Sequence, residues 1–224
     1  MKFDIAEKPL TVLGTYRTVC DALESEAGYF VTTAVSELQI STEGIVGDRH
    51  FGNTRLVRGR GKQLYEPNDY VIAHAGDRWP GIVIRNNRQW SAISQEELDG
   101  IAQKLDLERT LTPELVGANF LLSGNPHLSQ LPGLTYLVFS PRKDFFAGGR
   151  AEDSTLVVYG QAAPCTTAGQ ALVAPYGSSS LENRFPKAAY NHRGLVGWIE
   201  SPVGRVNIIK PGDCVWVLTP NGVD

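Results

Sequence analysis

Short apolar runs, broken by glycine and proline, dominate the hydrophobic pattern of this chain. The 13 prolines and 23 glycines place frequent turn signals between these runs, which favours an all-β or β-dominated architecture. The clearest turn signal is Pro211-Gly212-Asp213, near the end of the chain. The stretches that we predict as strands are Thr11–Thr15, Tyr29–Val35, Gln89–Ile93, Leu134–Ser140, Leu156–Tyr159, Gly194–Ile199, Arg205–Ile209 and Cys214–Leu218.

The segment Gln95–Leu105 has helical rather than strand periodicity. Ser94 and Glu97 have the spacing of a capping box, in which each side chain bonds to the backbone N–H of the other residue. The apolar positions that follow recur on one helical face: Leu98, Ile101, Ala102 and Leu105. We predict an amphipathic helix with a structural role. A weaker helical pattern lies near Pro164–Val173.

Length and charge narrow the class of protein. A chain of 224 residues suits a single domain, such as one barrel or sandwich, and we expect one domain over residues 1–224. The net charge of −3 argues against a general nucleic-acid binder. No apolar run approaches the roughly 20 residues that span a bilayer, and the N-terminus lacks the apolar stretch of a signal peptide. We therefore expect a cytoplasmic protein without membrane contact.

The three cysteines do not suggest a disulfide framework, since their number is odd and they lie far apart: Cys20, Cys165 and Cys214. They are also too few for an all-cysteine zinc or iron–sulfur site. The four histidines show no paired metal-binding spacing: His50, His74, His127 and His192. A bound metal is therefore expected to have few protein ligands.

The segment Gly47-Asp48-Arg49-His50-Phe51-Gly52 combines an acceptor, a fixed cation and a titratable group between glycines. Glycine lets the backbone turn sharply and approach a ligand closely. A surface turn in which Asp48 caps its own loop explains the same residues. Both interpretations stay open from the sequence alone.

The stretch from Arg49 to Lys62 carries several basic residues and no acid. Guanidinium groups match phosphate geometry, so an anion site is one interpretation and a solvated basic loop is the other. A nucleotide-binding P-loop is excluded here, because Leu56 stands where its first glycine belongs and Gln63 replaces the Ser or Thr. Asn119, after Gly117-Ala118, could orient a ligand or simply occupy a turn.

Cys165 is the cysteine whose setting suggests chemistry. It follows Pro164 and precedes two threonines, in a stretch predicted as a loop, whereas Cys20 and Cys214 are expected to be structural. Nearby cations would favour the thiolate, which binds metals or attacks electrophiles. A cysteine hydrolase pairing Cys165 with His50 or His192 is possible, but the sequence has neither a cysteine-protease signature nor a GxSxG elbow.

In this order, several short segments resemble the MOSC family, named for the C-terminal domain of molybdenum cofactor sulfurase. The resemblance covers roughly residues 10 to 218. The segment from Asn53 to Arg85 looks longer than in compact members of the family, and we expect it to serve as a lid or as a surface for a partner. The matching segments are Gly44-Ile45-Val46-Gly47-Asp48-Arg49-His50, Asn87-Arg88-Gln89-Trp90-Ser91-Ala92-Ile93-Ser94, Gly117-Ala118-Asn119-Phe120, Pro164-Cys165, Arg193-Gly194 and Lys210-Pro211-Gly212-Asp213.

The resemblance implies a β-rich, mostly antiparallel barrel-like fold with a few helices. It also implies that Cys165 ligates the metal of the molybdenum cofactor, a pterin-based group. The residues that it places beside the pterin or its phosphate are Arg49, Arg88 and Asn119, with Arg193 in a further matching segment. Proton relay by Asp48 or His50 is a hypothesis that rests on residue type and place.

These expectations combine into two hypotheses. The first is an oxidoreductase that reduces small N-hydroxylated compounds. It takes electrons from a separate protein, since the chain has no flavin fingerprint or iron–sulfur cysteine set. The second is a non-redox module that carries sulfur as a persulfide on Cys165, or that only binds the cofactor.

Overall fold

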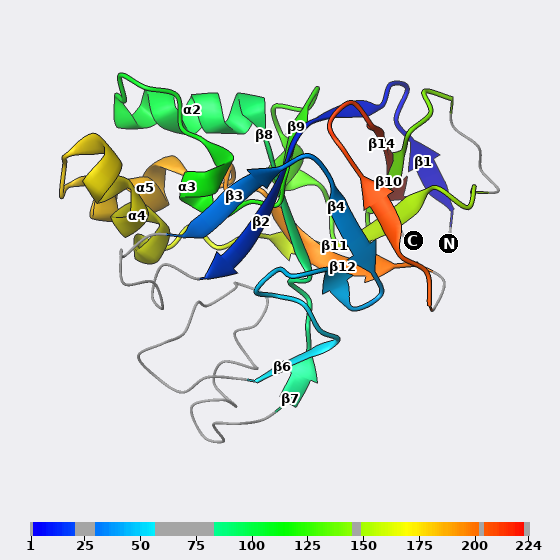
Figure 1. Cartoon of the computed structure of the whole chain (residues 1–224). Coiled ribbons are helices and arrows are strands. Elements are labelled where there is room, and N and C mark those ends of the chain that lie inside the picture. The colour runs from blue at the N-terminus through cyan, green and yellow to red at the C-terminus, as the bar shows by residue number, and fades with distance from the viewer. Residues whose placement is uncertain (1, 21–29, 57–82, 145–148, 202–203, 222–224) are drawn as a thin grey trace.

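The computed structural model describes residues 2–20, 30–56, 83–144, 149–201 and 204–221, and its architecture is β-rich with a few helices (Figure 1). The strands are β1 (Phe3–Ile5), β2 (Leu10–Cys20), β3 (Val31–Val35), β4 (Leu38–Ser41), β5 (Gly44–Ile45), β6 (Thr54–Leu56), β7 (Val83–Arg85), β8 (Trp90–Ser94), β9 (Phe120–Ser123), β10 (Tyr136–Ser140), β11 (Ser154–Gln161), β12 (Leu195–Glu200), β13 (Asn207–Ile209) and β14 (Cys214–Pro220). The helices are α2 (Gln95–Leu105), α3 (Pro113–Val116), α4 (Thr166–Tyr176) and α5 (Leu181–Ala188), with a 3₁₀ turn, η2, at Leu128–Gln130.

The main sheet has nine strands in the order β1-β14-β10-β11-β12-β8-β9-β2-β3. An additional antiparallel pairing joins β2 to β14, where Leu10 meets Val215 and Thr11 meets Cys214. This pairing brings the sheet back onto itself, so the strands from β2 round to β14 form a barrel. Only the β8–β9 pair of this sheet is parallel among the described strands. The predicted mostly antiparallel, barrel-like fold is confirmed.

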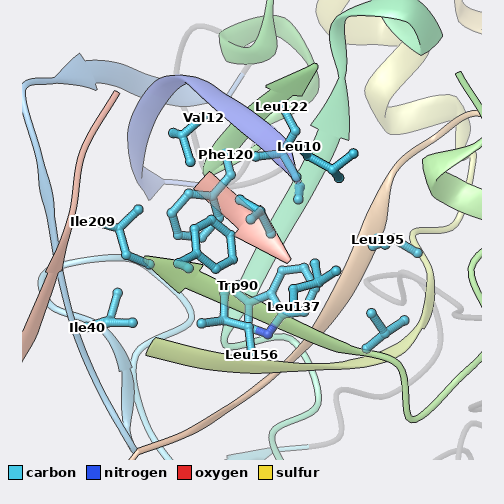
Figure 2. Close-up of a cluster of buried hydrophobic side chains, with 14 of the residues drawn as sticks. Leu10, Val12, Ile40, Trp90, Phe120, Leu122, Leu137, Leu156, Leu195 and Ile209 are labelled. Atoms are coloured by element: carbon cyan, nitrogen blue, oxygen red, sulfur yellow. The ribbon is translucent and has the colours of Figure 1, made fainter. Parts of the chain in front are cut away.

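Alternation along the strands fills the barrel with apolar side chains. In β10 and β11, Leu137, Phe139, Leu156 and Val158 are buried on one face. Period-2 alternation places such residues on the same side of the sheet. They belong to a cluster that also contains Trp90 and Phe120. Figure 2 shows Trp90, Phe120 and Leu137 converging inside the barrel.

The helices gather on one side of the sheet, away from β1 and β14 (Figure 1). They enclose a second apolar cluster, which contains Leu98 and Ile101 of α2, Leu172 of α4 and Phe185 of α5. Because α2 and α3 both lie in the connection between the parallel strands β8 and β9, that crossover supplies one part of the cluster, and α4 and α5 supply another. No helix among the described residues is long and apolar enough to cross a membrane.

The helix Gln95–Leu105 begins and ends where the sequence predicts, with both bonds of the capping box present. The weaker helix near Pro164–Val173 is α4, which begins one residue after Cys165. The sequence pattern missed α5, whose interior contains Pro186. It also missed the short strands β4 and β5, which with β13 form a separate three-stranded sheet. Residues 57–82 of the long segment lie outside the described residues, and its two ends form the β6–β7 pair.

Candidate functional site

The loop that follows β5 is fixed by the carboxylate of Asp48, which is only 6% exposed. Its Oδ1 accepts a hydrogen bond from the backbone N–H of His50 (3.0 Å), and its Oδ2 accepts one from the backbone N–H of Thr18 (2.9 Å). The side-chain amide of Asn119 donates a further bond to Oδ2 at 2.7 Å. Asp48 therefore caps its own loop, as the structural interpretation expects, but it is buried and ties the loop to β2 and to the start of β9.

Asn119 continues this network into the barrel wall. Its Oδ1 accepts from the backbone N–H and the hydroxyl of Ser91, each at 2.9 Å. Its Nδ2 also donates to the carbonyl of Tyr16 at 3.3 Å. All the hydrogen-bonding positions of the amide are thus used within the protein. Asn119 acts here as the link between the loop, β2 and β8.

The other end of the loop is held by two buried amides that the sequence analysis did not single out. Asn86 donates to the carbonyls of His50 (2.7 Å) and Gly52 (2.9 Å). Gln89 donates to the carbonyls of Thr42 and Gly52 and accepts from the backbone N–H of Ile199 at 2.8 Å. The segment Asn86–Gln89 therefore connects the loop to β12. The sequence signal for this segment was that Gln89 lies, with Arg88, in a stretch that resembles the MOSC family.

Arg49 projects from this fixed loop over an aromatic ring. Its guanidinium carbon lies 5.0 Å from the centre of the Phe30 ring. Phe30 is itself buried and belongs to the helix-side apolar cluster. Gly117 lies against the same ring, and a Cβ built there would approach Phe30 Cδ1 at 3.0 Å.

Two other predicted arginines have structural contacts of their own. Arg193 is 9% exposed and donates from Nη2 to the carbonyl of Val116 at 2.6 Å, so it supports the C-terminal end of α3. Its guanidinium also lies 5.9 Å from the Phe185 ring centre. Arg88 is half-buried, and its backbone N–H donates to Asn86 Oδ1 at 3.0 Å.

Cys165 is the N-cap residue of α4 and is a free, half-buried cysteine. An N-cap side chain usually accepts a hydrogen bond from the first turn of its helix. The side chain of Cys165 makes no such bond. Cys165 packs against the same apolar cluster that contains Phe30. The short helix α3 contacts α4, β2 and β3, and it leads directly into Gly117-Ala118-Asn119. The cysteine and the Asp48–Arg49 loop are therefore built around one cluster.

Burial raises the pKa of Asp48 above its ordinary value of 3.8. The N–H groups of His50 and Thr18, the Asn119 amide and the Arg49 charge oppose this shift, since each stabilises the carboxylate. His192, the other histidine considered for a cysteine–histidine pair, has a pKa lowered by burial and by the charges of Lys104 and His127. Within the described ranges, no three His, Cys, Asp or Glu side chains cluster as they would around a metal ion.

Comparisons with known proteins agree with this architecture. The family model of the MOSC domain matches residues 47–216. A Bacillus subtilis protein, YuaD, named as a proposed metal–sulfur cluster biosynthesis protein, is 31% identical over 174 residues, which are 77% of each chain.

Two solved structures share the fold. The crystal structure of Bacillus subtilis YuaD superposes with a TM-score of 0.75 at 24% identity, covering 98% of this chain and 100% of that one. The crystal structure of YiiM from Geobacillus stearothermophilus gives a TM-score of 0.52 at 14% identity, covering 96% of this chain and 77% of that one.

Proposed function

Because this chain belongs to the MOSC domain family, we propose that it binds the molybdenum cofactor with the sulfur of Cys165 as a ligand of the metal. The family takes its name from the C-terminal domain of molybdenum cofactor sulfurase. The observation that carries the proposal is the position of Cys165. It is half-buried, free and at the N-cap of a helix, and its side chain makes no capping bond.

The residue types proposed to hold the cofactor fit such a group. A thiolate is a soft ligand of the kind that transition metals accept. Guanidinium groups suit the phosphate of a pterin cofactor, and Arg49 adjoins the same apolar cluster as Cys165. In this proposal Arg49, Arg88 and Arg193 hold the anionic part of the cofactor. Asn119, whose amide is engaged within the protein, contributes by keeping the loop of Arg49 in place.

We propose further that the chain is an oxidoreductase that reduces small N-hydroxylated compounds. When bound, the cofactor supplies two-electron oxygen-atom chemistry, while the protein orients and insulates it. Both oxygens of Asp48 accept hydrogen bonds, so its part is to hold the loop. Proton relay then falls to His50, which lies two residues along that loop. Electrons come from a separate donor protein.

The test is the molybdenum content of the purified chain, expressed in a host that makes the cofactor. We expect nearly one molybdenum per chain in the wild type and a loss of the metal in Cys165→Ala. Cys214→Ala is the matched control, because Cys214 is a free cysteine buried in β14. Absence of molybdenum from all three proteins, despite a competent host, would refute cofactor binding.

The reaction is tested on molybdenum-loaded protein with a panel of N-hydroxylated substrates. We expect turnover with a chemically reduced viologen as electron source and none with reduced nicotinamide alone. Turnover with nicotinamide and no carrier would contradict the separate donor protein. Loaded protein that reduces none of the substrates with viologen would contradict the N-hydroxylated substrate class.

The second candidate is a non-redox module that carries sulfur on Cys165. The name of the relative YuaD, a proposed metal–sulfur cluster biosynthesis protein, supports it. The two candidates separate by intact-protein mass spectrometry. An added sulfur atom that is lost in Cys165→Ala, on protein without molybdenum, favours the sulfur carrier.

A further inference from the structure

Arg49 takes part in a closed ring of contacts that joins three separate segments of the chain. Phe30 lies before β3, Gly117 follows α3, and Arg49 follows β5. The guanidinium of Arg49 lies over the Phe30 ring, and the ring lies against Gly117.

Hydrogen bonds complete this ring of contacts. The Ser91 hydroxyl contacts the carbonyl of Gly117 at 3.3 Å and bonds to Asn119 Oδ1 at 2.9 Å. Asn119 in turn donates to Asp48, the neighbour of Arg49 in the sequence. One segment, residues 117–119, therefore fixes both the ring under the Arg49 side chain and the loop that carries its backbone.

We infer that Phe30, seated on Gly117, is a positioning residue for Arg49 and holds its guanidinium ready for the anionic group of the ligand. This inference rests on the proposed function, in which Arg49 binds that anion. A long side chain normally loses rotamer freedom when it binds, and a stacked guanidinium has lost part of that freedom beforehand. The aromatic face also attracts the cation directly.

Gly117 helps to hold the Phe30 ring in place. Its φ is +65°, in the left-handed region that favours glycine. A Cβ there would come within 3.0 to 3.3 Å of three atoms of the Phe30 ring. Gly117→Ala should therefore displace the ring and, through it, disturb the guanidinium of Arg49.

The first readout is the Nε–Hε signal of Arg49 in nitrogen-15 NMR spectra of the full chain as purified. In the wild type we expect a rigid side chain whose Hε is shifted by the aromatic ring current. Phe30→Leu should remove the shift and raise the mobility, Gly117→Ala should weaken both, and Phe30→Tyr should restore the wild-type signal. Phe139→Leu, which removes a buried ring from the barrel core, is the matched control and should leave Arg49 unchanged.

The second readout is the salt concentration at which the chain releases half of its molybdenum. We expect Phe30→Leu to release molybdenum at a lower salt concentration, which corresponds to cofactor binding weakened about 5- to 10-fold, within the range of cation–π contributions. Phe30→Tyr should release it at the same salt concentration as the wild type. An unchanged Arg49 signal in folded Phe30→Leu, or an equal change in Phe139→Leu, overturns the inference. If the wild type holds no molybdenum, the proposed function fails, and the Arg49 signal alone still decides whether Phe30 positions it.

Discussion

The two sides of the candidate site are built in opposite ways. The Gly47–Gly52 loop is held by its own buried carboxylate, Asp48, and by three buried amide side chains from distant segments: Asn86, Gln89 and Asn119. Cys165 sits at a helix end where its side chain makes no capping bond. The difference separates two tasks: a rigid frame can present a cation in one orientation, while a thiol that is not used for structure stays available to a ligand.

The largest effect expected from this contrast is the loss of folding stability when Asp48 is replaced. Asp48→Ala removes the acceptor for the N–H groups of Thr18 and His50 and for the Asn119 amide. Leaving buried donors unsatisfied should lower the free energy of unfolding by about 3 kcal/mol, measured by urea denaturation. Cys165→Ala should lower it by less than about 1 kcal/mol. Equal losses of stability in the two variants would contradict the proposed difference between the rigid loop and Cys165.

The next effect concerns the far end of the loop. Gln89→Ala removes the acceptor for the buried N–H of Ile199 and the donors to Thr42 and Gly52. We expect a loss of about 2 kcal/mol in the free energy of unfolding. Gln39→Ala is the matched control: Gln39 is an exposed residue of β4, and its loss should change stability by no more than about 0.5 kcal/mol.

A smaller effect should appear as a pH dependence. The pKa of Asp48 is raised in the folded protein, so the native state holds its proton at a pH where the unfolded chain has released it. The contribution of Asp48 to stability is therefore greatest below the ordinary pKa of 3.8 and falls as the pH rises toward the raised value.

We expect Asp48→Asn to flatten the decline of the unfolding free energy with rising pH in that window. The decline should not vanish, because burial also raises the pKa values of Glu97 and Asp213. Urea denaturation at several pH values, from 4 upward, measures the slope in both proteins. An identical slope would show that the Asp48 carboxyl does not titrate differently in the folded state.

The smallest effect should have the opposite sign. Serine is a much better N-cap than a residue that makes no capping bond, so Cys165→Ser should stabilise the protein by a few tenths to about 1 kcal/mol. The same variant should lose molybdenum under the proposed function. Higher melting temperature together with lost metal would identify Cys165 as a position kept for chemistry at the expense of stability. A destabilised variant would indicate that the thiol has a structural role.

Local patterns predicted the parts of the molecule that depend on nearby residues. The capping box of α2 and the self-capping of Asp48 involve residues two or three positions apart, and both could be predicted. The functions of Asn86 and Gln89 could not, because Gln89 bonds to Ile199, 110 residues away. Spacing along the chain carries no information about such partners. Likewise α5 was missed because Pro186 interrupts its pattern, while tertiary packing against α2 and α4 supports the helix.

The seam between β2 and β14 has a consequence for how this protein reaches its native state. It joins Leu10 and Thr11 to Val215 and Cys214, more than two hundred residues further along the chain. Contacts of such high sequence separation make folding slow, because a long loop must close before they form. On the ribosome, β2 emerges early and must wait for β14. Until then the first residues of β2 lack their β14 partner, so demand for chaperones should rise as delivery of the last strand becomes slower.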